Sequence, residues 1–401
     1  MPNAVYVVDA VRTPIGKYKG ALASVRADDL AAHVVSALVK RQPAIATRID
    51  QVVFGATNQA GEDNRNVARM AVLLAGLPYE IAAVTVNRLC GSGLEAVNDA
   101  ARMVALGEAD VAIAGGVESM TRAPYSMPKA DEPFSRQPPP LYDTTLGWRY
   151  PNPKMQQRFE LISMGETAEN VANKFGIGRE EQDRWALESH KKAAAAWERG
   201  AFAEELAPVE VRQAKGPAVL FDRDECVRPD SSLDKLAKLK PAFREGGSVT
   251  AGNSSPLNDG AAAVLLASEN AVKELGLTPR LRFIASATAG VDPNYMGEGP
   301  IPATKKALAR AGLRAPNVDL IEINEAFAAQ TLACIRGLEL DAKRVNLYGG
   351  AIALGHPIGA SGARLVATLS SVMKADPKAR IGLAALCIGV GQGIAALFEK
   401  A

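Results

Sequence analysis

The sequence is poor in several residues that mark particular classes of protein. Its 401 residues include three histidines and four cysteines, and aromatic residues make up only 5%. No C-x-x-C pair occurs among the cysteines, which argues against a zinc ribbon, another metal site or a disulfide framework. We therefore expect no metal and a reducing compartment, with the cytoplasm as the location. The four cysteines are Cys90, Cys226, Cys334 and Cys387.

Strong net charge and long apolar runs are also missing. The formal net charge is +2, which gives no basis for a nucleic-acid partner. The longest weakly polar run, Gly382 to Phe398, is interrupted by glycines and Gln392 and is a poor membrane span. The chain opens on the apolar run Ala4–Val8 without a cationic lead, so we expect no secretory signal and no membrane partner.

The chain instead alternates strand-like and helical patterns. Strand-like runs at 51–55, 82–86 and 111–116 are separated by helical periodicity, and a second series begins near residue 261. This alternation predicts an α/β fold with a largely parallel sheet covered by helices, in which 82–86 is a buried strand. Between residues 121 and 248 the pattern is interrupted by a proline-rich stretch and a basic segment, for which a solvated surface is the ordinary interpretation.

The two halves of the chain repeat each other. Asp50–Phe54 resembles Asp319–Ile323, and Gly91–Gly93 resembles Ala360–Gly362 with the same offset between the copies. We therefore predict a duplicated α/β unit with the interruption inserted in the first copy. Two helix N-termini, one after Cys90 and one in the second copy, then face the boundary between the halves, where parallel sheets place their ligand sites.

Cys90 lies between a strand-like run and a helical pattern, flanked by Gly91 and Gly93. This places its thiol at a helix N-terminus, where free backbone N–H groups and the helix dipole favour an anion. We expect a nucleophilic thiol with a lowered pKa. A buried core cysteine is the alternative.

Of the three histidines, His33 and His190 lie in helical patterns and are interpreted as ordinary helix residues. His356 differs, because it lies beside Pro357 in the glycine-rich segment Gly349–Gly362. Such a segment adds little packing area and suits a tight loop that a ligand can approach. A cysteine nucleophile needs an imidazole nearby to take its proton, which makes His356 the candidate.

Two further groups follow strand-like runs. Cys387 precedes the glycines of 389–393, where exposed N–H groups suit an oxyanion, although a core cysteine is again the alternative. Asn324 opens the sequence NEAFA directly after the run 318–323, where a helix cap is the plainer interpretation.

Together these motifs are specific, and through them the chain resembles the thiolase family over nearly its whole length. The resemblance rests on NRLCGSG around Cys90, NEAFA, GGAIALGHP and CIGVGQG. It is closest to degradative and 3-oxoadipyl-CoA-type thiolases in two segments, Asn58–Asn66 and Asp143–Arg149. Further matching segments are Arg12–Gly16, Gly115–Met120 and Thr250–Asn253.

The resemblance implies the thiolase fold, with duplicated α/β halves in a layered α-β-α-β-α arrangement and an inserted loop domain. The N-terminal half would comprise residues 1–121 and 249–272, the loop domain that covers coenzyme A residues 122–248, and the C-terminal half residues 273–401. It implies an acyltransferase that makes or breaks a carbon–carbon bond between CoA thioesters, by Claisen condensation or thiolysis, in fatty acid or related acyl metabolism.

The resemblance also implies roles for single residues. Cys90 is acylated, His356 activates its thiol, Cys387 moves the α-proton of acetyl-CoA, and Asn324 holds a water for one oxyanion. The backbone N–H groups of Cys90 and Gly389 serve the other oxyanion. The implied coenzyme A contacts are Met164, Arg228, Phe243, Ala251, Ser255, Leu257, Met296 and Phe327.

The resemblance implies no tightly bound cofactor, and its partners are acyl-CoA and CoA, which bind as substrate or product. It also implies a homodimer or homotetramer, with residues 125–140 as a tetramer contact. Ser163 and Lys235 stand where many biosynthetic members have His and Ser, which disfavours short-chain biosynthetic specificity, and Tyr348 replaces a common Asn. Two alternatives stay open. A non-catalytic acyl-CoA or lipid-binding relative would lack a reactive group, and a decarboxylating ketosynthase would carry His or Asn chemistry in place of Cys387.

Overall fold

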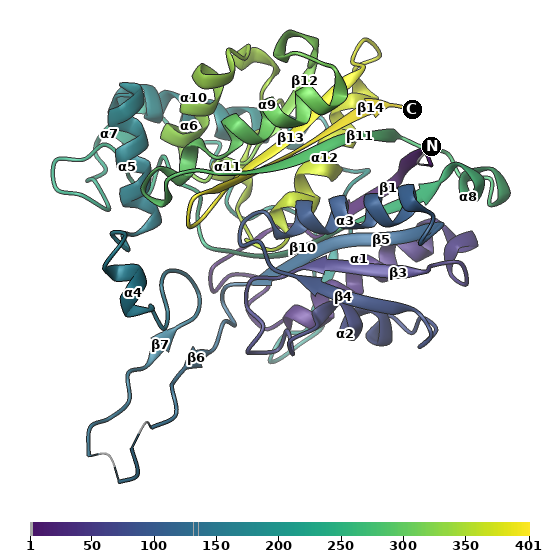
Figure 1. Ribbon diagram of the computed structural model, residues 1–401, viewed down its shortest axis with the longest axis horizontal. Coiled ribbons are helices and arrows are strands. Elements are labelled where there is room, and N and C mark those ends of the chain that lie inside the picture. Colours follow the sequence, from purple (N-terminus) through teal and green to yellow (C-terminus); the bar gives the residue numbers. More distant parts are fainter. Residues whose placement is uncertain (1–2, 131, 135) are drawn as a thin grey trace.

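The computed structural model describes residues 3–130, 132–134 and 136–401, and a mixed β-sheet with helices on its faces forms its centre (Figure 1). Ten strands form this sheet, in the order β12-β13-β14-β11-β1-β10-β5-β3-β4 with β2 paired to β10. Its strands are β1 (Val5–Arg12), β2 (Gly16–Lys17), β3 (Gln51–Gly55), β4 (Ala82–Val86), β5 (Val111–Ser119), β10 (Asn258–Ser268), β11 (Leu281–Gly290), β12 (Leu320–Ile323), β13 (Ile381–Ile388) and β14 (Gln392–Lys400).

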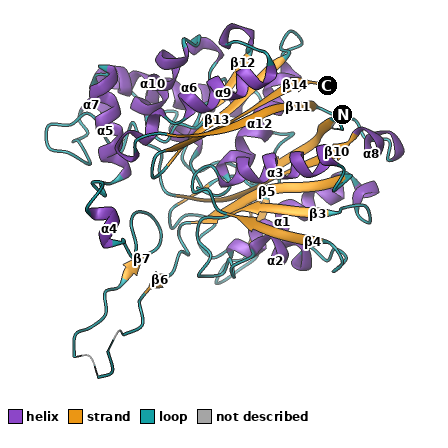
Figure 2. Ribbon diagram, viewed as in Figure 1, coloured by secondary structure: helices purple, strands orange, loops and turns teal. Residues whose placement is uncertain are grey.

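The helices form three layers around and between the two parts of the sheet (Figure 2). The central layer is α3 (Ser92–Leu106) and α12 (Ser361–Ala375), whose apolar side chains share one core with strands of both halves. On the outer faces, α1 (Ala27–Arg41) and α2 (Val67–Leu74) cover the first half, and α9 (Pro300–Ala311) and α10 (Ala328–Leu338) cover the second. The layered α-β-α-β-α fold is thus confirmed.

The duplication is visible in the strand order. In the first half β3-β5-β10-β1 are neighbours, and in the second half β12-β13-β14-β11 repeat that order with the same relative directions. A short antiparallel pairing between β1 and β11 joins the halves. The expectation of a largely parallel sheet was wrong. Parallel pairs are β3–β4, β3–β5 and β12–β13, whereas β10 and β14 run back against their neighbours, β14 through a tight turn after β13.

Strand β4 also differs from the prediction of a buried strand. It occurs at the predicted residues but lies at the edge of the sheet, with side chains that are exposed or half-buried. Val84 is 37% exposed. Periodicity could not reveal this, because an edge strand and a central strand of five small apolar residues have the same pattern.

The inserted segment lies between β5 and β10 and covers one end of the second half (Figure 1). A narrow arm with the short strands β6 and β7 at its base projects away from the body. No helix in the described parts of the chain is both long and apolar enough to cross a membrane. The elements of the insertion are β6 (Tyr125–Ser126), β7 (Tyr142–Asp143), α4 (Pro153–Gln156), α5 (Met164–Phe175), α6 (Arg179–Glu198), β8 (Val209–Val211), β9 (Val219–Phe221) and α7 (Leu233–Ala237).

Short helices complete the chain. Helix α8 (Glu269–Glu274) follows β10, and α11 (Ala351–Leu354) precedes the loop that carries His356. Single-turn 3-10 helices lie at Pro43–Ile45, Ala315–Asn317 and Ala342–Arg344, and a longer 3-10 segment, Pro293–Glu298, is kinked at Tyr295.

Candidate active site

The loops that carry the four reactive groups come from both halves of the fold. Cys90 lies between β4 and α3, whereas Asn324 follows β12, His356 lies between α11 and α12, and Cys387 lies near the end of β13. Asn324 and His356 are in contact, with 3.3 Å between Nδ2 and Nε2. Cys90 is close enough to Cys387 to raise the pKa of that thiol, and the backbone N–H of Gly389 reaches the Cys90 thiol.

The turn that presents Cys90 is tightly built. Leu89 takes the left-handed conformation with φ of 48°. Its backbone N–H donates to Asn87 Oδ1 at 2.9 Å, and its carbonyl accepts from Ser92 Oγ at 2.6 Å. A Cβ on Gly91 would lie 2.6 Å from the side chain of Ile388 in β13. Any side chain at position 91 would force Ile388 to move, so Gly91 allows the nucleophile turn to approach the strand of the other half closely.

The Cys90 thiol does not have the lowered pKa that its helix N-terminus predicts. Desolvation is the largest influence and raises the pKa, and the opposing hydrogen bond from the Gly389 N–H only reduces that rise. Although Cys90 as a residue is half-buried, its sulfur has lost much of its hydration. The thiol is therefore protonated at neutral pH and needs a base before it can attack a thioester.

His356 is buried, and hydrogen bonds fix both its backbone and its ring. Its backbone N–H donates to Asn258 Oδ1 at 2.8 Å. Ser361 Oγ donates to the carbonyl of Pro357 at 2.8 Å and lies 2.5 Å from Nδ1, so it accepts the Nδ1–H. Nε2 then carries the lone pair, which accepts from Asn324 Nδ2 at 3.3 Å. Burial, and secondly the charge of Arg364, lower the pKa of His356 to about 3, so the ring is neutral at physiological pH.

Asn324 is not a helix cap. Helix α10 begins four residues later at Ala328, and its N-cap residue makes no side-chain cap hydrogen bond. The Asn324 side chain is fully buried, and its Oδ1 has no hydrogen-bond partner among the described residues. A buried acceptor of this kind, beside His356 Nε2, suits a bound polar atom.

Glu325 fixes the loops on both sides of this contact, a role the sequence motif does not reveal. Its carboxylate accepts hydrogen bonds from Trp185 Nε1 at 3.0 Å, Ser189 Oγ at 2.7 Å and Asn346 Nδ2 at 2.9 Å. A fourth comes from the backbone of Ile352, in α11 just before the His356 loop. One buried carboxylate therefore ties helix α6 of the insertion to the Asn324 and His356 loops.

Cys387 lies in an apolar core with Met296 and Phe327, against which Met164 packs. Its thiol is almost fully buried, and burial, followed by the nearby Cys90, raises its pKa well above the ordinary value. Cys387 is thus a protonated thiol that could give up its proton only to a strongly basic partner such as a carbanion, or after a charge rearrangement nearby.

Glu118 of β5 was also missed by the sequence reasoning. Its Oε2 accepts from the backbone N–H of Thr57 at 3.1 Å, from Thr57 Oγ1 at 2.8 Å and from the backbone N–H of Gly359 at 2.8 Å. Since Gly359 lies three residues after His356, this carboxylate also joins the two halves. Long-range contacts of buried polar groups leave no local signal in a sequence.

The eight predicted coenzyme A contacts fall into two groups. Met164, Met296 and Phe327 lie around Cys387, and Phe243 adjoins this group because it meets Phe327 edge-to-face with ring centroids 6.0 Å apart. Arg228, Ala251, Ser255 and Leu257 lie farther out along the inserted segment and the loop after it. Arg228 and Leu257 line a cavity of about 390 Å³ together with Lys17, Tyr18, Glu225, Cys226 and Pro256.

Two hydrogen bonds fix the positions of residues in this outer group. The backbone N–H of Arg228 donates to Nδ1 of His190 at 3.2 Å, so this helix histidine positions the arginine. The backbone N–H of Ser255 donates to the carbonyl of Ala326 at 3.0 Å, which connects the loop to the NEAFA segment.

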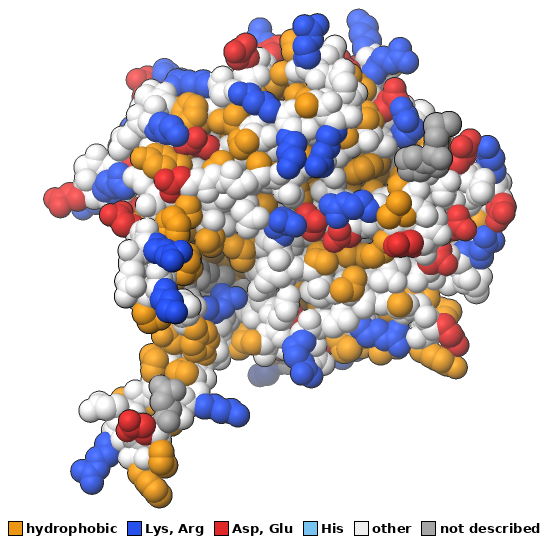
Figure 3. Space-filling model, viewed as in Figure 1, with side chains coloured by type: hydrophobic (Ala, Val, Ile, Leu, Met, Phe, Trp, Pro, Cys, Tyr) orange, Lys and Arg blue, Asp and Glu red, His pale blue; other side chains and the backbone are white. Residues whose placement is uncertain are grey.

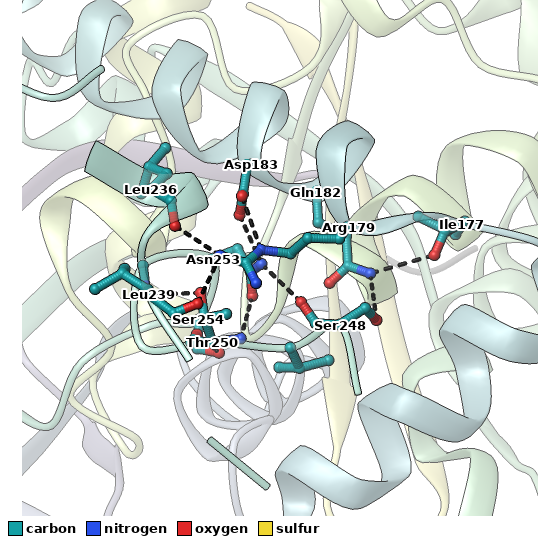
Figure 4. A network of polar contacts seen from close by, with 12 residues as sticks. Ile177, Arg179, Gln182, Asp183, Leu236, Leu239, Ser248, Thr250, Asn253 and Ser254 are labelled. Carbon is teal, nitrogen blue, oxygen red and sulfur yellow. Dashed lines mark hydrogen bonds and ion pairs between the residues drawn. The ribbon is translucent and has the colours of Figure 1, made fainter. Parts of the chain in front are cut away.

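A polar network holds the loop 248–255 against the insertion (Figure 4). Asn253 Nδ2 donates to Asp183 Oδ1 at 2.9 Å, and its Oδ1 accepts from the Thr250 N–H at 2.8 Å. Arg179 pairs with Asp183 at 2.8 Å and donates to the carbonyls of Leu236, in α7, and Leu239, just beyond that helix. The loop that carries Ala251 and Ser255 is therefore positioned before any ligand arrives.

Comparison with known proteins gives a consistent result. The family models "Thiolase, N-terminal domain" and "Thiolase, C-terminal domain" match residues 5–270 and 277–400. A beta-ketoadipyl-CoA thiolase of Acinetobacter baylyi is 54% identical over 398 residues, which cover 98% of this chain and 99% of the relative. The crystal structure of the Bacillus anthracis acetyl-CoA acetyltransferase superposes with a TM-score of 0.94 at 41% identity, covering 100% of this chain and 99% of the other. That of human mitochondrial 3-ketoacyl-CoA thiolase in complex with CoA gives 0.91 at 39%, covering 100% and 98%.

Proposed function

The chain belongs to the thiolase family, and we propose that it cleaves 3-oxoadipyl-CoA, a 3-oxoacyl thioester with a terminal carboxylate, by thiolysis with coenzyme A. The general activity is that of an acyltransferase acting on CoA thioesters by Claisen condensation or thiolysis. The observation that carries the narrower proposal is the 54% identity over nearly the full length to a beta-ketoadipyl-CoA thiolase. The two segments that carry this likeness adjoin in space, because Asn58 Nδ2 donates to Thr144 Oγ1 at 2.8 Å.

In the proposed cycle, His356 Nε2 takes the proton of the Cys90 thiol, and the thiolate attacks the 3-oxo carbon of the substrate. The carbon–carbon bond between C2 and C3 then breaks. The acyl group stays on Cys90, and the acetyl-CoA carbanion takes a proton from Cys387. This division suits the geometry, since a neutral imidazole can accept a proton and a thiol of raised pKa can supply one to a carbanion.

The second half of the cycle reverses these roles. The Cys387 thiolate takes the proton of the incoming coenzyme A thiol, and the CoA sulfur attacks the acyl-Cys90 thioester. Acyl-CoA leaves, and Cys90 recovers its proton from His356. For 3-oxoadipyl-CoA the products are acetyl-CoA and succinyl-CoA, and each proton that moves is returned, so that the enzyme ends as it began.

Two oxyanion sites stabilise the developing charges in this proposal. The backbone N–H groups of Cys90 and Gly389 serve one, supported by the Gly389 N–H reaching the Cys90 thiol. His356 and a water on Asn324 serve the other, supported by the buried, unpartnered Oδ1 of Asn324. Removing one such donor typically lowers kcat by about 10²- to 10³-fold.

Coenzyme A is proposed to lie between the inserted domain, residues 122–248, and the C-terminal half, residues 273–401. The N-terminal half is proposed to comprise residues 1–121 and 249–272. The thiol end of coenzyme A would pass Met164, Met296 and Phe327 toward Cys387. Its phosphates would lie at the cavity lined by Arg228 and Lys17. The chain itself supplies the reactive groups, so no tightly bound cofactor is needed.

A homodimer or homotetramer in the cytoplasm completes the proposal. All four cysteines are free thiols, which suits a reducing compartment. The projecting arm exposes apolar side chains (Figure 3), among them Tyr125, Met127 and Leu141, and is proposed as the tetramer contact. A dimeric mass in solution would contradict the tetramer.

Thiolysis rates decide the substrate. We expect kcat/KM to be highest for 3-oxoadipyl-CoA and lower for acetoacetyl-CoA and for longer neutral 3-oxoacyl-CoA substrates. A preference for acetoacetyl-CoA would instead indicate short-chain metabolism. Inactivity on all three would support the alternative of a non-catalytic acyl-CoA-binding protein, and release of carbon dioxide from malonyl-CoA would support a decarboxylating ketosynthase.

A further inference from the structure

We propose that Arg149 binds the terminal carboxylate of the acyl chain and so selects a dicarboxylic 3-oxoacyl group over a neutral one. This inference rests on the proposed function, because the terminal carboxylate is the group that distinguishes 3-oxoadipyl-CoA from neutral 3-oxoacyl-CoA substrates.

The Arg149 guanidinium is half-buried and lacks a carboxylate partner in the described parts of the chain. Among the residues that the structure describes, it donates only to backbone carbonyls, to Thr144 at 3.3 Å through Nη1 and to Thr57 at 3.5 Å through Nη2. Both hydrogen bonds are long. A guanidinium has five N–H donors in a planar fork, so donors remain for a ligand, and a carboxylate is the group that the fork fits best.

One of these carbonyls connects Arg149 to the nucleophile turn. The Thr57 oxygen also accepts from Asn87 Nδ2 at 3.2 Å, and Asn87 Oδ1 accepts from the N–H of Leu89, the residue before Cys90. Three successive hydrogen bonds thus connect the arginine to the residue before Cys90. This separation suits an arginine that binds a carboxylate at the far end of a short acyl chain and not the thioester itself.

The segment that carries Arg149 also leads to the space beside Gly389, whose N–H is proposed to serve the same oxyanion site as that of Cys90. Trp148 Nε1 donates to the carbonyl of Ile162 at 3.4 Å, next to Met164 at the start of α5. A Cβ added to Gly389 would lie 3.3 Å from Met164 Sδ and 3.5 Å from Leu89 Cδ1. Leu89 and Met164 therefore flank the space beside Gly389, and the segment 148–164 extends from there to Arg149. An acyl chain on Cys90 would run along this segment.

Neighbouring arginines are already neutralised. Arg88, directly before the nucleophile turn, pairs with Glu95 at 2.8 Å and also donates to Gln392. Arg122 pairs with Glu62. Arg65 lies on the loop 58–66 but is exposed, so water weakens its attraction for a carboxylate. Arg149 therefore combines partial burial with a charge that no described carboxylate pairs.

The test compares two substrates of the same chain length, 3-oxoadipyl-CoA and 3-oxohexanoyl-CoA, in which a methyl group replaces the carboxylate. We expect Arg149→Gln to lower kcat/KM for 3-oxoadipyl-CoA by about 10- to 100-fold, the usual value of a charge-assisted hydrogen bond pair. The rate on 3-oxohexanoyl-CoA should change less than about threefold. Arg149→Lys, which keeps the charge but loses the fork, should fall between wild type and Arg149→Gln. Arg158→Gln, an exposed arginine after α4, is the matched control and should match wild type on both substrates.

The outcomes separate this inference from the proposed substrate. If the wild-type enzyme cleaves 3-oxohexanoyl-CoA but not 3-oxoadipyl-CoA, the proposed substrate is wrong. If wild type and Arg149→Gln both cleave 3-oxoadipyl-CoA efficiently, the proposed substrate is correct but Arg149 does not bind its terminal carboxylate. Equal losses on both substrates would show that Arg149 only supports the loop, and a selective loss in Arg65→Gln instead of Arg149→Gln would also overturn the inference.

Discussion

Asn258 Oδ1 accepts a hydrogen bond from the backbone N–H of His356 at 2.8 Å, and this contact joins the two halves at the site. Asn258 opens strand β10 of the first half, and its Nδ2 donates to the carbonyl of Gly16 at 2.9 Å. A strand of the half that carries Cys90 therefore fixes the position of the His356 loop of the other half. Glu118 does the same through Gly359.

Replacing Asn258 tests whether this contact positions the imidazole. Asn258→Ala leaves the buried His356 N–H without an acceptor, which costs about 1–3 kcal/mol of stability. We also expect kcat for thiolysis to fall at least about tenfold while the KM for coenzyme A changes little. Urea unfolding and steady-state kinetics measure the two effects. An unchanged kcat with the stability loss intact would show that the contact is only structural.

Cys387 should be needed for carbon–carbon chemistry but not for holding the acyl group. In Cys387→Ala the acetyl-CoA carbanion has no proton donor, so thiolysis and condensation should fall about 10²- to 10⁴-fold. Acetylation of Cys90 by acetyl-CoA should still occur, and mass spectrometry of the intact protein should show the added acetyl group. Retention of most of the condensation rate would exclude Cys387 as the group that moves the α-proton.

The lowered pKa of His356 predicts a pH dependence of stability. In the unfolded chain a histidine titrates near pH 6.5, whereas the buried ring titrates at about 3. Between these values the unfolded state binds the proton first, so the stability that neutral His356 contributes is complete above about pH 6.5 and is lost as pH falls toward 3. His190, with a pKa of about 4, acts in the same direction.

Replacing the imidazole should flatten this dependence. Relative to wild type, His356→Asn is expected to reduce the slope of unfolding free energy against pH by up to about 1.4 kcal/mol per pH unit in that window. Urea unfolding between pH 7 and pH 4 measures the slope. Equal slopes in the variant and the wild type would mean that His356 is not a buried neutral base.

Arg228 should contribute to binding coenzyme A without taking part in the chemistry. Because it lines the outer cavity and is not in contact with the reacting thiols, Arg228→Gln should raise the KM for coenzyme A about tenfold with kcat preserved. Pantetheine, which lacks the nucleotide phosphates, should be used equally by variant and wild type. Lys215→Gln, an exposed lysine between β8 and β9, is the control. An equal loss with pantetheine would show that Arg228 supports the site of reaction and does not act by binding the nucleotide phosphates.

Particular residues show where sequence reasoning works and where it stops. The repeat of Gly91–Gly93 in Ala360–Gly362 predicted a duplicated fold, and the motifs around Cys90 and His356 identified the family, because both are local patterns. Neither could predict the contacts of Glu325, since its four donors come from distant parts of the chain. Nor could the rule for helix N-termini predict a raised Cys90 pKa, because desolvation depends on what folds over the sulfur.

The central claim is that one half supplies the acyl acceptor, Cys90, and the other half supplies the groups that act on it. The most direct test is to incubate the enzyme with labelled acetyl-CoA, digest it and locate the label by mass spectrometry. The account predicts one labelled peptide, which contains Cys90, and none in Cys90→Ala, whose thiolysis rate should be abolished. A label on Cys387 or Cys226 instead, or full activity in Cys90→Ala, would contradict it.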